Sequence, residues 1–188
     1  MGVRILKLQR RSLLKLGSVV TLSALGAPAI AKIAAPQGLV GRQIAMSHLH
    51  TAEKIGLVFA VLDRYVDPAL VKLNHFLRDH YSNEVGVMDP ALYDLMYRIK
   101  ADLGVSQSYE VISGYRSPKT NDRLRKTRGG GVAKRSLHMQ GKAIDIRLPG
   151  VPLKELRDAA LAQKGGGVGY YPRDGFVHID TGRVRSWG

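Results

Sequence analysis

Two histidines and one aspartate carry the clearest chemical signal in this sequence. The side chains of His138, Asp145 and His178 are of the kinds that bind zinc, and a chain without cysteine has no thiolates to offer a metal. Three protein ligands leave one coordination position open, which is typical of catalytic rather than structural zinc. We therefore expect these three residues to bind Zn²⁺.

The local sequence indicates how these side chains could converge. Apolar and polar residues alternate around Asp145, which predicts a strand with Asp145 on one face. Gly141 permits a tight turn before that strand, so that His138 on the preceding loop can fold back toward Asp145. His178 lies in the middle of a second predicted strand, residues 176–180, with its apolar neighbours on the opposite face.

The elements that must position these residues are helices first and mainly strands later. Each Asp-Pro pair is a helix start signal, because aspartate caps a helix and proline favours its first turn. The order predicts an α+β fold, in which a small antiparallel sheet carries the zinc site and the helices pack on one side. The predicted elements are a strand pair within residues 42–59, a helix from Asp67-Pro68 to His80, a helix from Asp89-Pro90 to Leu103, a strand at 109–113, a polar loop at 114–135, a strand at 142–148, a helix at 152–163, and strands at 168–171 and 176–180.

The beginning of the chain has the pattern of a targeting segment. Residues 1–15 are basic, the next residues are apolar or small, and Ala29-Ile30-Ala31 is a small-x-small cleavage pattern. These features predict a signal peptide over residues 1–31, a linker over 32–41 and one domain over 42–188. A membrane anchor is the alternative, although the apolar run is shorter than the roughly 20 residues that span a bilayer as a helix.

The export route is indicated by the segment Gln9-Arg10-Arg11-Ser12-Leu13-Leu14-Lys15, which resembles a twin-arginine signal. It departs from that pattern in having Gln before the arginine pair and Leu where Phe is usual. The resemblance implies export of an already folded protein to the periplasm, with membrane contact only through the signal. An ordinary signal for unfolded chains, with a chance arginine pair, is the alternative.

The net charge of the chain is strongly positive. The formal value is +14, and residues 1–31 contain five basic and no acidic residues, so +9 remains for the rest. Residues 116–135 are rich in basic side chains, with Asp122 as their one acid. This stretch favours either a basic rim that attracts an anionic polymer or a solvated loop. Nucleic acid is not an expected partner, because no recognition helix and no aromatic residues accompany the basic ones.

One block of sequence around the first two expected ligands resembles a known family. Ser136-Leu137-His138-Met139-Gln140-Gly141-Lys142-Ala143-Ile144-Asp145 matches the S-x-H-x-x-G-x-A-x-D signature of the M15 metallopeptidases. That family includes D-Ala-D-Ala carboxypeptidases and murein endopeptidases, and it shares its fold with the signalling domain of hedgehog. Further resemblances lie at residues 113–118, 167–172 and 176–180, and those at 50–53 and 77–80 are similar to the exported YcbK-like (DUF882) branch.

The resemblance implies roles for five residues. His138, Asp145 and His178 would be the zinc ligands. Arg116 would hold a carboxylate or carbonyl of the substrate, since its planar fork suits paired oxygen contacts. Ser136 would hydrogen-bond the bound peptide near the metal. The zinc would polarise the scissile carbonyl and activate a water molecule.

The proton acceptor is where this chain departs from the family pattern. Several relatives carry a carboxylate three residues before the final histidine, and here that position is Gly175. Asp174 lies on the adjacent turn, and Asp180 shares a strand face with His178. Both are candidates for a catalytic role, and we favour Asp174 as the base and Asp180 as a partner that orients His178.

These features together predict an exported zinc metallopeptidase that hydrolyses peptide cross-links of peptidoglycan, a murein endopeptidase acting on stem peptides. A D-Ala-D-Ala carboxypeptidase is one alternative. A zinc-bearing module that binds peptidoglycan without catalysis is another, because Gly175 removes a carboxylate that some relatives have.

Four further histidines lie outside the signature. We expect His75 and His80 to be surface or packing residues on the first predicted helix. For His48 and His50 we favour a structural role over a place in the site.

Overall fold

The computed structural model describes residues 41–127 and 131–188. The predicted signal peptide over residues 1–31 lies outside this part of the chain, as does the predicted linker except for Gly41, which begins a strand. None of the helices in the described part is long and apolar enough to cross a membrane.

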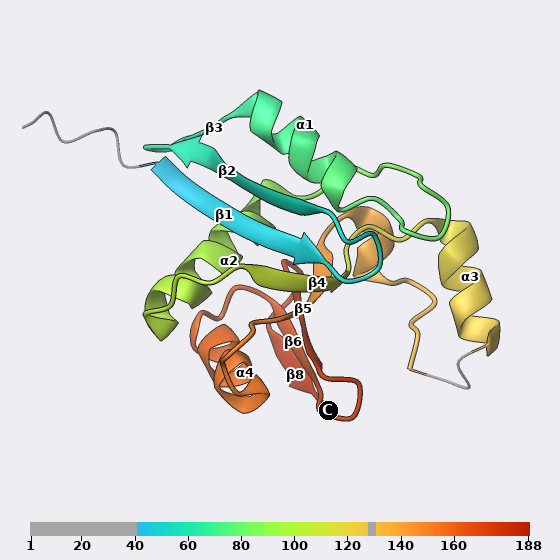
Figure 1. Ribbon diagram of the computed structural model, residues 1–188. Coiled ribbons are helices and arrows are strands. Elements are labelled where there is room, and N and C mark those ends of the chain that lie inside the picture. Colours follow the sequence, from blue (N-terminus) through green and yellow to red (C-terminus); the bar gives the residue numbers. More distant parts are fainter. Residues whose placement is uncertain (1–40, 128–130) are drawn as a thin grey trace, which may run out of the picture. The chain divides into compact units, whose positions relative to one another are not determined.

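Strands and helices follow one another in an order close to the predicted one (Figure 1). In chain order they are β1 Gly41–His48, β2 Lys54–Val61, β3 Arg64–Tyr65, α1 Asp67–Phe76, α2 Pro90–Leu103, β4 Tyr109–Ser113, α3 Pro118–Thr127, the short 3₁₀ helix η1 Leu137–Gln140, β5 Ala143–Arg147, α4 Leu153–Ala162, β6 Gly167–Tyr171, β7 Phe176–Asp180 and β8 Arg185–Trp187.

The strands of the described residues form one mixed sheet with the order β3-β2-β1-β4-β5-β7-β6-β8. The α+β class is therefore confirmed, but the prediction of a small antiparallel sheet is wrong. β1 pairs with β4 in parallel and β6 pairs with β8 in parallel, while the other neighbours are antiparallel. Between β1 and β4 the chain passes through α1 and α2, and a crossover of that length allows a parallel return.

One face of the sheet and three helices share a single hydrophobic core. On the central strands, Ile144 pairs with Ile179 and Ile146 pairs with Val177, and all four side chains are fully buried. Residues of α1, α2 and α4 belong to the same cluster. Tyr109 of β4 also donates a hydrogen bond from its hydroxyl to the Met96 carbonyl of α2 (2.9 Å). The opposite face of β5 and β7 therefore remains available for a site.

Two helix predictions differ from the structure. α1 begins at Asp67 with Val66 as its cap, and it ends at Phe76 instead of reaching His80. The predicted polar loop contains the helix α3. Two of the residues that α3 buries, Thr120 and Asn121, are polar, so the sequence of this helix lacks the apolar periodicity that predicts a helix. Asp79, which follows α1, accepts the Ser117 N–H (2.9 Å), and this bond joins the two regions.

Candidate metal centre

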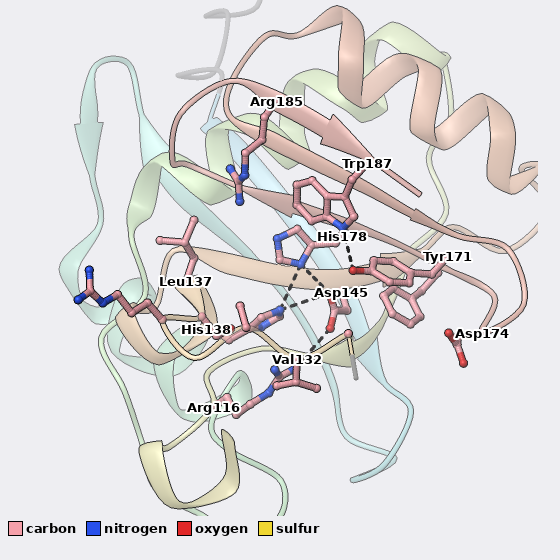
Figure 2. A pocket seen from close by; sticks show the side chains of 15 residues that line it. Arg116, Val132, Leu137, His138, Asp145, Tyr171, Asp174, His178, Arg185 and Trp187 are labelled. Atoms are coloured by element: carbon pink, nitrogen blue, oxygen red, sulfur yellow. Dashed lines mark hydrogen bonds and ion pairs between the residues drawn. The ribbon is translucent and has the colours of Figure 1, made fainter. Parts of the chain in front are cut away.

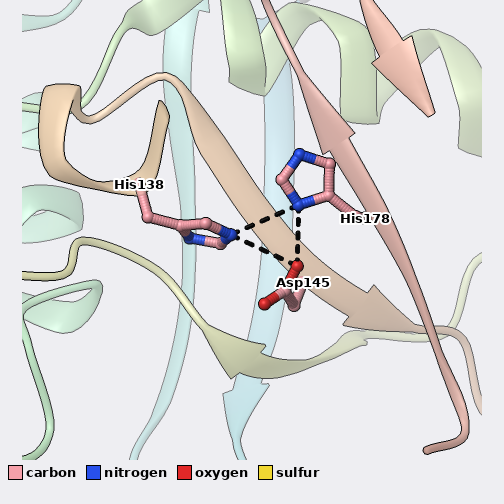
Figure 3. Close-up of side chains that lie close together, drawn as sticks. All are labelled: His138, Asp145 and His178. Carbon is pink, nitrogen blue, oxygen red and sulfur yellow. Dashed lines mark hydrogen bonds and ion pairs between the residues drawn. The ribbon is translucent and has the colours of Figure 1, made fainter. Parts of the chain in front are cut away.

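The three predicted ligands come together from three different elements (Figure 3). Asp145 of β5 lies directly opposite His178 of β7 in the strand ladder. His138 reaches them from η1. Asp145 Oδ1 lies 2.9 Å from His178 Nδ1 and 3.3 Å from His138 Nε2, and the two ring nitrogens are 3.2 Å apart. One ligand atom from each residue lies within 4.8 Å of the others, and all three residues are buried.

A short turn of helix holds His138 in place. Part of the predicted loop is the 3₁₀ helix η1, which ends at Gln140 and is capped by Gly141 with a left-handed φ of +66°. A side chain at position 141 would also collide with the Val87 carbonyl. The Gly141 carbonyl accepts the N–H of Asp89 (2.9 Å), so the turn packs against the segment before α2. The prediction that Gly141 makes the turn possible is confirmed.

The outer nitrogen of each histidine is already committed to a hydrogen bond. His138 Nδ1 lies 2.8 Å from the Gly114 carbonyl oxygen, which can only accept, so this nitrogen carries the proton. His178 Nε2 lies 3.1 Å from Asp180 Oδ2. His138 Nε2 therefore presents its lone pair to the space between the two rings, and His178 Nδ1 faces the same space. Such outer hydrogen bonds orient histidine ligands in metal sites, so these residues fit a zinc ion.

Burial and charge set the protonation of the triad. Burial would raise the pKa of Asp145, but the adjacent His138 and His178 hold it well below its usual range. Burial lowers the pKa of His138. Burial also opposes the charged form of His178, but hydrogen bonds to Asp145 and Asp180 outweigh it and raise the pKa to about 9. His178 is therefore a charged imidazolium at neutral pH, with a proton on each ring nitrogen.

An open pocket of about 660 Å³ lies over the triad (Figure 2). Arg116, Ser136 and Asp174 line it, as do the ligands. Arg116 Nη2 lies 3.7 Å from Asp145 Oδ2 and donates to Ser113 Oγ (3.4 Å).

Asp180 does not line this pocket. It is fully buried behind His178, where it also accepts the backbone N–H groups of Gly167 and Gly182 (both 2.9 Å). Burial opposes its ionisation, but bonds from His178, Arg185 and these N–H groups hold its pKa well below the usual range. The Asp180 carboxylate therefore faces His178 Nε2, the nitrogen that points away from His138 and Asp145.

Aromatic side chains form one wall of the pocket, and the sequence did not predict them. Tyr171 and Phe176 stack with ring centroids 4.6 Å apart, and Trp187 Nε1 donates to the Tyr171 hydroxyl (2.8 Å). The Trp187 ring lies 5.2 Å from the His178 ring. The one signal that could have found this wall is that Trp187 is the only tryptophan of the chain.

Three of the other histidines form a cluster of their own. His50 and His80 stack at 4.2 Å between ring centroids, and His48 lies 5.5 Å from His80. His48 Nδ1 accepts the backbone N–H of His50 (3.2 Å), which supports the structural role that we favoured. His80 lies on the loop after α1 and not on the helix, contrary to expectation, whereas His75 is an exposed residue of α1.

Two imidazoles and a carboxylate at the base of an open pocket form the donor set of catalytic zinc enzymes. Comparison with known proteins narrows this class. The model of the family described as peptidoglycan L,D-endopeptidase MepK, an M15 peptidase family, matches residues 37–187. The chain belongs to this family, so the resemblance seen in the signature block is confirmed.

The similar proteins agree with this assignment. The peptidoglycan L,D-endopeptidase MepK of Escherichia coli (strain K12) is 45% identical over 179 residues, which cover 95% of this chain and 96% of the relative. The probable peptidoglycan L,D-endopeptidase MepK of Haemophilus influenzae is 38% identical over 180 residues, which cover 95% of each chain. No solved structure matches the chain significantly.

Proposed function

We propose that this protein is an exported, zinc-dependent endopeptidase that hydrolyses peptide cross-links of peptidoglycan. The observation that carries the proposal is the convergence of His138, Asp145 and His178 below an open pocket, with one nitrogen of each histidine facing inward. Membership of the family supports peptidoglycan as the substrate class. Because the relatives are named L,D-endopeptidases, we propose that the scissile bond joins an L- and a D-configured centre.

The residues around the triad would bind and orient the peptide. Arg116 would pair with a carboxylate or carbonyl oxygen of the substrate, since its guanidinium lines the pocket next to Asp145. Ser136, which also lines the pocket, would hydrogen-bond the peptide backbone. A bound zinc ion supplies Lewis-acid polarisation of a carbonyl and acidification of water.

We propose Asp174 as the proton acceptor. Among the described residues that line the pocket, it is the one carboxylate besides the ligand Asp145. It is exposed on the turn between β6 and β7, at the edge of the pocket in Figure 2. Gly175, where some relatives have a carboxylate, has a left-handed φ of +72°, which favours glycine. Asp180 would orient His178, because its oxygens already accept from Gly167, Gly182 and Arg185 and it does not line the pocket.

Digestion of purified sacculi tests the function. We expect the protein to convert cross-linked muropeptide dimers into monomers, measured by mass spectrometry of the released muropeptides. A chelator should stop the reaction and added zinc should restore it. In the His138→Ala variant the cleavage activity should fall by more than the roughly 10- to 100-fold that is typical of changes to residues outside the ligand shell of a metal site. His75→Ala, which changes an exposed histidine on α1, serves as the matched control.

The same digest separates the alternatives. Release of free D-alanine from uncross-linked stems, with dimers left intact, would instead identify a D-Ala-D-Ala carboxypeptidase. Sacculus binding with zinc present and no new muropeptides would identify a non-catalytic binding module. Equal products from wild type and His138→Ala would exclude catalysis by this site.

The proposal includes export by the twin-arginine route, with residues 1–31 as the signal. Its support is the arginine pair at positions 10 and 11 and the short apolar run that follows. Peptidoglycan stems are anionic, and they would be attracted by the +9 formal charge outside this segment.

A further inference from the structure

The C-terminal strand β8 brings two side chains to the metal centre. β8 pairs in parallel with β6, with Arg185 opposite Gly167 and Trp187 opposite Gly169. Gly169 is also the partner of His178 on β7. Since side chains alternate along a strand, Arg185 and Trp187 project from the face of the sheet that carries His178. Figure 2 shows both side chains next to His178.

Arg185 forms a two-point salt bridge with Asp180, the carboxylate that accepts a hydrogen bond from His178. Its Nη2 lies 2.7 Å from Asp180 Oδ2, and its Nη1 donates to Asp180 Oδ1 at 3.0 Å. Asp180 has no exposed surface, whereas about 30% of the Arg185 side chain is exposed. A two-point pair of this kind fixes direction as well as distance. The two guanidinium nitrogens therefore restrain the orientation of the Asp180 carboxylate. This carboxylate in turn accepts a hydrogen bond from His178 Nε2.

The surrounding chain is built around this pair. A side chain on Gly167 would collide with the Arg185 guanidinium and the Asp180 carboxylate. Arg185 also donates to the Arg183 carbonyl (3.0 Å), and its Cζ lies 4.7 Å from the centre of the Trp187 ring. The guanidinium is thus held by a carboxylate, a carbonyl and an aromatic face, and none of these contacts requires a bound substrate.

We propose that Arg185 is a positioning residue of the metal centre. Through Asp180 it fixes the ring of His178 so that Nδ1 points at Asp145 and His138. Without Arg185, Asp180 Oδ1 keeps its two backbone N–H bonds, but Oδ2, which accepts from His178, loses its 2.7 Å bond to the guanidinium. The imidazole is then held less firmly in its preset direction, which weakens the site for zinc. The inference rests on the proposed function only in taking the triad to bind zinc, and it does not depend on which bond is cut.

The test measures metal binding without substrate. Zinc affinity is determined by competition with a chromophoric chelator for wild type, Arg185→Met, Arg185→Lys and Arg183→Met. We expect Arg185→Met to bind zinc about 10- to 100-fold more weakly, which is the range for outer residues of metal sites. Arg185→Lys should recover part of the loss, because it keeps the charge but not the fork. Arg183→Met removes an exposed arginine two positions away and should bind as wild type.

Two further readouts distinguish positioning from general stability. The absorption spectrum of the cobalt-substituted protein should change in Arg185→Met and not in Arg183→Met, because it reports ligand geometry. The double variant Asp180→Asn/Arg185→Met should bind zinc almost as well as Asp180→Asn alone, because Arg185 acts on His178 through Asp180. If Arg185→Met does not fold, Arg185→Lys decides, and it should still bind zinc more weakly with an altered cobalt spectrum.

Wild-type zinc affinity and an unchanged cobalt spectrum in Arg185→Met, or in Arg185→Lys where the methionine variant does not fold, would overturn the inference. Additive losses in the double variant would also overturn it. A wild type that binds zinc but cleaves no cross-link would instead contradict the proposed function and leave the role of Arg185 standing.

Discussion

His178 is the histidine of the triad that is protonated on both ring nitrogens at neutral pH. Asp145 on one side and Asp180 on the other accept from its two nitrogens. The same carboxylates raise its pKa to about 9, while His138 and Asp145 have lowered pKa values. A metal at the centre must therefore displace this proton from Nδ1, and the proton acts as a competitor.

This competition predicts the pH dependence of zinc binding. Zinc should release about one proton from the protein at pH 7, and its affinity should rise about tenfold per pH unit until the pH passes the pKa of His178. Calorimetry in buffers with different ionisation enthalpies measures the released proton. Asp180→Asn removes one of the two carboxylates that raise this pKa, so it should release fewer protons at pH 7. An affinity that is flat between pH 6 and 8 would contradict the prediction.

The loop between α1 and α2 joins the start of α3 to the segment that follows β1. Asp79 in this loop accepts the N–H of Ser117 at the start of α3. The next residue, His80, stacks on His50, which lies beyond the end of β1. Burial first, and then the neighbouring histidines, lower the pKa of His80 to about 4, although Asp79 opposes the shift.

The lowered pKa of His80 predicts loss of stability in acid. The unfolded chain takes up a proton near pH 6.5 and the folded chain only near pH 4, so stability falls as the pH drops through this window. His80→Phe keeps the ring but removes the proton site. Its free energy of unfolding should fall by about 1 kcal/mol less than that of wild type between pH 7 and 4.5, a figure discounted for partial solvent screening.

Urea unfolding at the two pH values measures this difference. His75→Gln, on the exposed side of α1, is the control and should follow wild type. His48 lies beside His80 and its pKa is also lowered to about 4, first by burial, so part of the acid sensitivity should remain in His80→Phe. An identical loss in wild type and His80→Phe would remove His80 from the explanation.

At the scale of the whole molecule, the proposed export of a folded protein agrees with the way the candidate zinc site is assembled. The ligands lie on η1, β5 and β7, so the site exists only once the sheet has assembled. The twin-arginine route carries folded proteins, which would allow the metal to be loaded before export.

The export proposal predicts the effect of changing the arginine pair. Replacing both Arg10 and Arg11 by lysine keeps the charge of the segment and should leave the protein in the cytoplasmic fraction, as detected by immunoblotting after cell fractionation. Arg4→Lys is the matched control outside the pair. Normal export of the double variant would contradict the twin-arginine route. It would instead favour an ordinary signal peptide that exports unfolded chains.

The candidate ligands and much of the element order could be predicted from the sequence because their signals are local. His138, Gly141 and Asp145 lie within one short block, and strand alternation and the Asp89-Pro90 helix start depend on neighbouring residues. The structure agrees with these predictions at η1, β5 and α2.

Only the tertiary structure decided what surrounds those ligands. The short edge strand β8 has no recognisable pattern, because its pairing with β6 uses backbone groups. The grip of Arg185 on Asp180, the Trp187 wall and the carbonyl that fixes His138 are contacts between separate elements. The sequence by itself therefore determined which side chains are the candidate metal ligands, whereas strand pairing and packing decided how those side chains are held and what lines the pocket above them.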